Sequence, residues 1–134
     1  RLRAEDRARF VDFLLPGNQA WANKAPVLIA VVAKKTFTHN GTPNPTHQFD
    51  AGCSWGFLAL GAFQNGLITH SMLGFDHDKA REVLGLPDDF DVLAIIALGK
   101  HGDPSELSEA IREREIPSNR RPQSESVMEG KFRA

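Results

Sequence analysis

Two unbroken apolar runs stand out along a chain whose other segments mix polar and apolar positions. They are PVLIAVVA at residues 26–33 and VLAIIALG at residues 92–99. Runs of this length, rich in β-branched residues and bounded by turn residues, indicate strands that are buried on both faces. We therefore predict that residues 26–33 form a central strand and residues 91–99 a second buried strand. A shorter strand is predicted at residues 67–72.

Helical periodicity appears between these runs. Residues 4–15 are predicted as an amphipathic helix that Pro16 and Gly17 stop, and residues 18–23 as a short helical turn. Asp76 is a suitable N-cap for a helix that runs to residue 84, where Gly85 provides the C-cap. After the last strand, residues 103–114 are predicted as a further helix, and residues 117–134 as a polar tail.

Residues 48–65 predict the longest helix, and its composition is unusual. Small residues, including three glycines, alternate with an apolar stripe made of Phe49, Cys53, Phe57, Leu60 and Phe63. A glycine inside a helix costs about 1 kcal/mol relative to alanine, and close approach by another helix is the usual compensation. We therefore expect this helix to be buried, against another helix or a second subunit.

The element order is helix, strand, helix, strand, helix, strand and tail. This order predicts a sheet flanked by helices, of the α/β or the α+β class, in a single domain over residues 1–134. Residues 34–46 are polar and contain Gly41, Pro43 and Pro45, which predicts a long loop. Loops of this length in compact domains are usually functional or mobile.

Composition narrows the function classes. The apolar content of 41% and charged content of 25% are ordinary for a globular protein. The net charge of -1 gives no reason to expect nucleic acid or an anionic membrane as a partner. The single Cys53 cannot form an internal disulfide, so we predict a cytoplasmic protein. The chain starts at Arg1 and directly in a helical pattern, which suggests a piece of a longer protein.

Several segments, in order, resemble the nitroreductase family. The segment LITHSMLGFDHDKAREVLGLPDDFDVLAIIALG at residues 67–99 carries the family's Gly-Phe-Asp turn, its Leu-Gly-Leu-Pro helix end and its Ala-Leu-Gly strand end. Upstream, residues 18–21 (NQAW) and residues 49–52 (FDAG) match, and downstream so do Arg120-Arg121-Pro122 and Ser124-Glu125. The resemblance covers nearly the whole chain.

This resemblance implies an α+β fold, with a nitroreductase-like mixed sheet flanked by helices, in a domain-interleaved homodimer. It implies two FMN sites, each built from both subunits, and ping-pong transfer of electrons from NAD(P)H to an organic acceptor such as a nitroaromatic or a quinone. Family members also carry an N-terminal segment with arginine and proline motifs that contact FMN. That segment is missing here, which leaves the FMN site incomplete.

The resemblance also implies where the flavin is bound. Reduced flavin takes up hydride at N5, and a backbone amide on a tight turn can donate a hydrogen bond there. By family position this turn is Met72-Leu73-Gly74. From the residues alone, Gly74 is equally well explained as a turn glycine that permits a positive φ.

For the FMN phosphate, the resemblance points to Arg120, with Arg121 as its neighbour. A guanidinium group binds a phosphate through paired N–H donors. In the family a second basic residue lies two positions earlier, where this chain has Ser118, so the phosphate site is weaker than usual. From the residues alone, the two arginines are also explained as a solvated basic pair on a tail.

Other chemistry is less well supported. His39, His47, Asp50 and Cys53 lie in one region, but their spacing matches no zinc pattern, so we predict no metal site. No catalytic side chain is predicted, because the flavin carries the chemistry. Trp55 is explained by core packing or by a place near an acceptor pocket. Two alternatives stay open: a flavin-free relative that acts as a dimeric binding or structural protein, and, less well supported, an unrelated two-layer domain.

Overall fold

A three-stranded antiparallel sheet is the main feature of a computed structural model that describes residues 3–132. The strands are β1 (Val27–Lys34), β2 (Ile68–Met72) and β3 (Phe90–Gly99), in the order β1-β3-β2. The chain divides into two compact units, the first ending at His101 and the second beginning at Gly102. The sheet belongs to the first unit.

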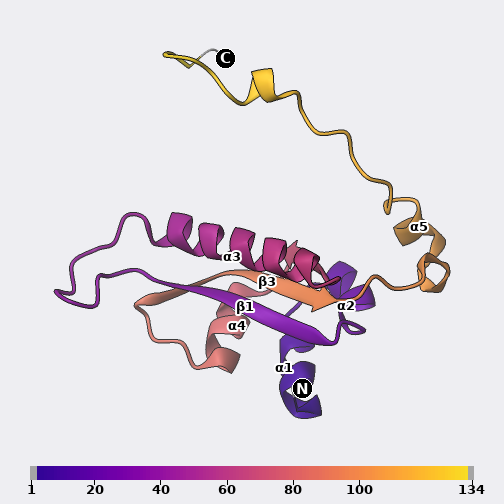
Figure 1. Cartoon of the computed structure of the whole chain (residues 1–134). Coiled ribbons are helices and arrows are strands. Elements are labelled where there is room, and N and C mark those ends of the chain that lie inside the picture. The colour runs from indigo at the N-terminus through magenta and orange to yellow at the C-terminus, as the bar shows by residue number, and fades with distance from the viewer. Residues whose placement is uncertain (1–2, 133–134) are drawn as a thin grey trace. The chain divides into compact units, whose positions relative to one another are not determined.

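Helices cover both faces of this sheet. The long helix lies across one face, where it contacts β1 and β2, and two shorter helices contact β1 and β3 from the opposite side (Figure 1). The helices of the first unit are α1 (Ala4–Asp12), α2 (Pro16–Ala22), α3 (His47–Gln64) and α4 (His77–Leu84). Pro16 is the first residue of α2 and not a stop signal, because its fixed φ suits the first turn of a helix.

The main hydrophobic core lies on the face of the sheet that α1 and α4 cover. Its largest members are Phe13 at the end of α1, Met72 in β2, Phe75 before α4 and Ile95 in β3, each at most 4% exposed. Phe13 and Phe75 meet edge to face, with ring centroids 6.4 Å apart. The core therefore joins the end of α1 to the residues that follow β2.

The prediction that residues 26–33 form a central strand is wrong. β1 is an edge strand within the described residues, β3 is central, and only Leu28 and Ala33 of β1 are buried. An apolar run cannot distinguish a central strand from an edge strand, because both side-chain faces of either one can meet apolar neighbours. The other strand predictions agree with the structure to within one residue.

Helix α3 is also less buried than its composition indicates. None of its residues is buried in the described chain, and Phe57 is 75% exposed. Residues at the spacing of Ala51, Trp55, Ala59 and Ala62 are partly covered, whereas the stripe of Phe49, Cys53, Phe57 and Leu60 lies on the opposite side of the helix and is exposed. A Cβ added at Gly52, Gly56 or Gly61 would meet nothing within 4 Å outside its own stretch of helix in the described chain. No packing partner for these glycines is thus seen among the described residues.

The caps predicted for α4 are confirmed. The carboxylate of Asp76 accepts a hydrogen bond from the Lys79 N–H at 3.0 Å, and Gly85 ends the helix with φ of 62°. That left-handed conformation favours glycine, because a Cβ would clash with the backbone.

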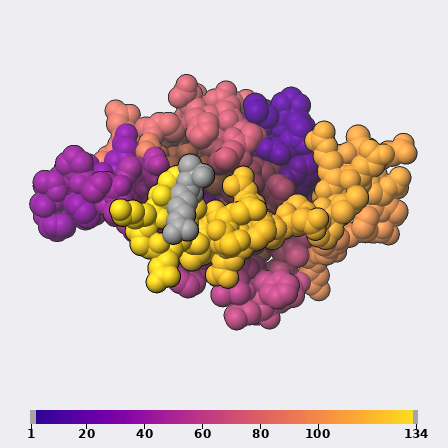
Figure 2. Space-filling model, turned by 90° about the horizontal axis from the view of Figure 1, so that it is seen from above, coloured from indigo at the N-terminus to yellow at the C-terminus, as the bar shows by residue number. Residues whose placement is uncertain are grey.

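The loop between β1 and α3 (residues 35–46) forms an arm that projects from the first unit, as the purple segment at the left of Figure 2 shows. The Phe37 N–H donates to the Thr42 carbonyl at 2.8 Å, and the Asn44 N–H donates to the Lys35 carbonyl at 2.7 Å. His47 closes this arm: its Nδ1 lies 2.8 Å from the Asn44 carbonyl oxygen and its Nε2 lies 3.3 Å from the Asp91 carboxylate.

The second unit holds only short elements: η1 (Pro104–Glu106), α5 (Glu109–Arg112) and η2 (Gln123–Glu125). The prediction of one helix over residues 103–114 is wrong, because Leu107 is extended, with ψ of 148°, and separates η1 from α5. Ile116, Val127 and Phe132 are exposed here. Among residues 3–132, no helix combines the length and the apolar character that crossing a membrane requires.

Candidate functional site

The turn that follows β2 brings together three of the five residues predicted to bind a cofactor. Met72 is the last residue of the strand and is buried in the core, at 2% exposure. Leu73 comes next and is 73% exposed. Gly74 is partly buried, and Phe75 returns to the core. The turn therefore presents Leu73 and the backbone of Gly74 at the surface of a rigid element.

Hydrogen bonds hold the backbone of this turn from two sides. The Gly74 carbonyl accepts two, from the Leu15 N–H at 2.9 Å and from the Asn18 side-chain amide at 2.9 Å. The Phe75 N–H donates to the Leu73 carbonyl at 3.1 Å. Within the described chain, the Gly74 N–H has no hydrogen-bond acceptor. A fixed N–H without a partner is a donor ready for an external acceptor, such as a ring nitrogen or an anionic oxygen.

A close contact explains why residue 74 is glycine. A Cβ at this position would lie 2.7 Å from Nδ2 of Asn18 and 3.8 Å from Cδ1 of Leu15. Gly74 is not among the glycines with positive φ, so the alternative explanation of a positive-φ turn glycine is wrong. A side chain at this position would push the Asn18 amide away from the Gly74 carbonyl, so glycine leaves room for that hydrogen bond.

The other two predicted residues, Arg120 and Arg121, lie in the second unit. Both are exposed, immediately before η2. Neither has an ion-pair partner within residues 3–132, so both guanidinium groups are available to an anion. An unpaired, exposed arginine binds a phosphate without first breaking an internal salt bridge.

The sequence left two explanations open for Trp55, core packing and a place near an acceptor pocket, and its surroundings have features of both. It is partly buried and faces the sheet, which agrees with packing, but its Nε1 is buried without a hydrogen-bond partner in the described chain. The ring borders a recess of about 300 Å³ between α3 and the sheet. The residues that line the recess are Val31, Gln48, Gly52, Trp55, Ser71, Leu93 and Ala94.

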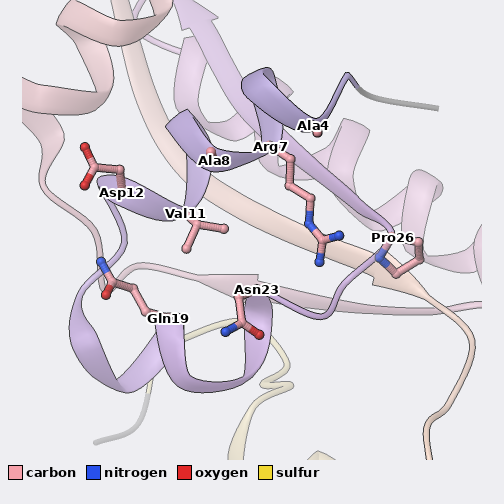
Figure 3. A pocket seen from close by; sticks show the side chains of 8 residues that line it. All are labelled: Ala4, Arg7, Ala8, Val11, Asp12, Gln19, Asn23 and Pro26. Carbon is pink, nitrogen blue, oxygen red and sulfur yellow. The ribbon is translucent and has the colours of Figure 1, made fainter.

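A larger surface groove, of about 680 Å³, lies between α1 and α2 (Figure 3). Arg7 and Val11 of α1 and Asn23, which follows α2, are among the residues that line it. None of the five predicted cofactor residues lines this groove. We therefore assign the candidate site to the turn after β2, where an unpartnered donor and an exposed apolar side chain coincide.

The histidines and the cysteine considered for a metal do not form a cluster. His47 is engaged by Asn44 and Asp91, Cys53 lies on the exposed side of α3, and His39 is in the arm next to the ring of Phe37. Among the described residues, no group of three or more histidine, cysteine, aspartate or glutamate side chains is close enough to hold a metal ion.

Asn18 is the site residue that the sequence did not reveal. It is 56 residues away from Gly74, and its contact with that glycine depends on how α2 packs beside the end of β2. The only signal was its position in the NQAW segment, which indicates a resemblance but no role.

Comparison with known proteins identifies a family and solved structures to which this chain is similar. The family model described as the nitroreductase family matches residues 2–100. A solved structure of an oxidoreductase containing FMN is 41% identical, with a TM-score of 0.92, over 97% of this chain and 67% of that one. An uncharacterized 15.4 kDa protein in the ask 5' region of Mycolicibacterium smegmatis is 35% identical over 105 residues, which are 76% of this chain and 67% of that protein.

A more distant structure shows the same fold. The NADPH:FMN oxidoreductase from Vibrio harveyi, complexed with NAD+, is 20% identical, with a TM-score of 0.72. The match covers 100% of this chain and 58% of that enzyme. At this identity the likeness concerns the arrangement of helices and strands alone.

Proposed function

Because the chain belongs to the nitroreductase family, we propose that it forms part of an FMN-dependent oxidoreductase that passes electrons from NAD(P)H to an organic acceptor. The proposal takes residues 1–134 as part of one nitroreductase-like domain. It places the protein in the cytoplasm, which suits a chain whose single Cys53 cannot form an internal disulfide. Nitroaromatics and quinones are the proposed acceptors, with NAD(P)H and acceptor using the site in turn.

The observation that carries the proposal is the unpartnered Gly74 N–H beside the exposed Leu73 side chain. When bound, FMN supplies the ring that accepts hydride at N5 and returns it to a second substrate. The Gly74 N–H is proposed to donate to that ring, and Leu73 to cover part of its apolar surface. Met72 anchors both from the core, because its buried side chain fixes the end of β2.

Arg120 and Arg121 are proposed to bind the phosphate of FMN. The phosphate carries close to two negative charges, and a guanidinium group offers it paired donors. Both side chains are exposed and lack an ion-pair partner in the described chain, which suits this role. Ser118 takes the place of a second basic residue, so we expect the phosphate to depend strongly on these two arginines.

The exposed stripe on α3 supports a homodimer. Phe49, Phe57 and Phe63 are each more than 70% exposed on one helix, and large apolar patches on a monomer mark interaction surfaces. The glycines of α3 have open space around them, which admits close approach by a second helix. We propose that this stripe packs against a second copy of the protein.

The test is a pair of binding titrations on the full-length protein, one with FMN and one with riboflavin, which lacks the phosphate. We expect Arg120→Ala to weaken FMN binding by about tenfold to a hundredfold, the range for loss of a charge-assisted hydrogen bond. Riboflavin binding should change little. Arg112→Ala is the control, because it removes an exposed arginine from the same unit outside the proposed phosphate site. A wild-type protein that binds neither compound would favour the flavin-free relative, a dimeric binding or structural protein.

A further inference from the structure

We propose that Asn18 is a positioning residue for the flavin, because its side chain fixes the direction of the Gly74 N–H. The inference rests on the proposed function and deepens it. Asn18 comes from α2, and its side chain donates to the Gly74 carbonyl, so we propose that its effect on a flavin is transmitted by the backbone of that residue.

The first step concerns the peptide between Gly74 and Phe75. Its carbonyl oxygen accepts hydrogen bonds from the Leu15 N–H and from Nδ2 of Asn18, both at 2.9 Å. A carbonyl oxygen has two lone pairs, so these two donors satisfy it. Because the peptide group is planar, these two hydrogen bonds fix the orientation of the whole peptide.

The second step concerns the peptide between Leu73 and Gly74. Its carbonyl oxygen accepts the Phe75 N–H at 3.1 Å, which closes a three-residue turn around Gly74. In a trans peptide the N–H points opposite to the carbonyl, and the described chain contains no cis peptide. The Gly74 N–H thus points away from the interior of the turn, in a direction that follows from the orientation of the next peptide.

Asn18 is needed because the backbone of Gly74 is otherwise free to rotate. Glycine has more backbone freedom than any other residue, so Gly74 could rotate if nothing held it. The Asn18 amide restrains it twice, by the hydrogen bond and by lying so close that a Cβ would be only 2.7 Å away. A donor that is held in place before the ligand arrives stabilises it more than a mobile one.

Loss of this restraint has a predictable direction. N5 of oxidised flavin accepts a hydrogen bond, whereas N5 of reduced flavin carries its own hydrogen and cannot accept the same bond. Asn18→Ala should therefore weaken binding of oxidised FMN by about fivefold and leave reduced FMN nearly unchanged. Since tenfold corresponds to about 30 mV for a two-electron couple, the midpoint potential of bound FMN should rise by about 20 mV.

Asn65→Ala is the matched control. Asn65 follows α3, and its side-chain amide donates to the Gly61 carbonyl at 2.8 Å, away from the turn. Asn18→Ala and Asn65→Ala each remove one hydrogen bond from a side-chain amide to a backbone carbonyl. Only Asn18→Ala should shift the midpoint potential. Asn18→Leu serves as the second variant, because its side chain keeps a similar branched shape without the N–H donor and should shift the potential in the same direction.

The experiment measures three quantities on the full-length wild-type protein and the three variants: thermal unfolding, FMN affinity and the FMN midpoint potential. A rise in potential for both Asn18 variants, with Asn65→Ala unchanged, supports the positioning role. Equal potentials in all four proteins that bind FMN would overturn it and leave Asn18 a structural residue. A wild-type protein that does not bind FMN would instead overturn the proposed function, so the two failures are distinguishable.

Discussion

The backbone N–H of Asp76 donates a hydrogen bond to the carbonyl oxygen of Phe13 at 2.8 Å. This bond ties the far side of the turn to the end of α1, while Leu15 and Asn18 hold its near side at Gly74. The segment between α1 and α2 therefore braces the turn at both ends. A donor mounted on such a support is held more precisely than one on a free loop.

Removal of the Asp76 side chain should destabilise the protein through α4. Its carboxylate caps the helix by accepting the Lys79 N–H, and loss of an N-cap costs about 1 kcal/mol of the free energy of unfolding. Asp76→Ala should show that loss in urea unfolding, and Asp76→Asn should retain most of the stability. Asp78→Ala is the control, because Asp78 lies in the first turn of α4 without capping it. Equal losses at both positions would contradict the capping role.

Substitutions at Leu73 and Phe75, which lie two residues apart in the turn, should affect cofactor binding and stability separately. Phe75 is 4% exposed and packs against Phe13, so Phe75→Ala should cost about 3–5 kcal/mol of unfolding free energy. Leu73 is 73% exposed, so Leu73→Ala should change stability by less than about 0.5 kcal/mol while it weakens FMN binding. Urea unfolding and FMN titration measure the two effects. A large stability loss from Leu73→Ala would show that this side chain is structural.

A charge on the exposed face of α3 should disrupt self-association. Phe57 is 75% exposed in the middle of the stripe, and Phe57→Asp should raise the dimer dissociation constant by about tenfold or more. Analytical ultracentrifugation measures that constant. Phe37→Asp makes the same change at an exposed phenylalanine of the arm and should have a smaller effect. If Phe57→Asp leaves the dimer intact, α3 is not the interface.

The cap that the Asp103 carboxylate provides at the start of η1 should be lost at low pH. The Ser105 backbone N–H, 2.8 Å from the Asp103 carboxylate, and then the Ser105 hydroxyl lower the pKa of Asp103 below its ordinary 3.8. A lowered pKa means that the cap stabilises η1 above the ordinary value and is lost as the pH falls through the lower, folded-state pKa. An NMR titration of the Asp103 carboxyl should give a midpoint below 3.8. Ser105→Ala should retain most of the shift, because the backbone donor remains; a midpoint at the ordinary value would contradict the cap.

Local signals predicted local structure well. The Asp76 cap, the left-handed Gly85 and the apolar runs of β1 and β3 are encoded within a few residues, and the structure confirms each element. Predictions that depend on distant neighbours did less well. The run of β1 does not reveal that it lies at a sheet edge, and the apolar composition of α3 does not reveal that its apolar stripe is exposed in the described chain.

The candidate site shows the same division. The position of Gly74 was predicted from the Gly-Phe-Asp resemblance, but its contact with the Asn18 amide was not, because Asn18 is 56 residues away. Contacts of this kind arise from packing between elements and leave no periodic signal in the sequence.

The central claim is tested most directly by anaerobic addition of NADH, and separately NADPH, to the full-length protein loaded with FMN, followed by its visible absorbance. We expect the two flavin bands to bleach with at least one of the nucleotides and to return when a quinone or a nitroaromatic is added. Bands that persist with both nucleotides, or a protein that stays colourless after incubation with FMN, would contradict it.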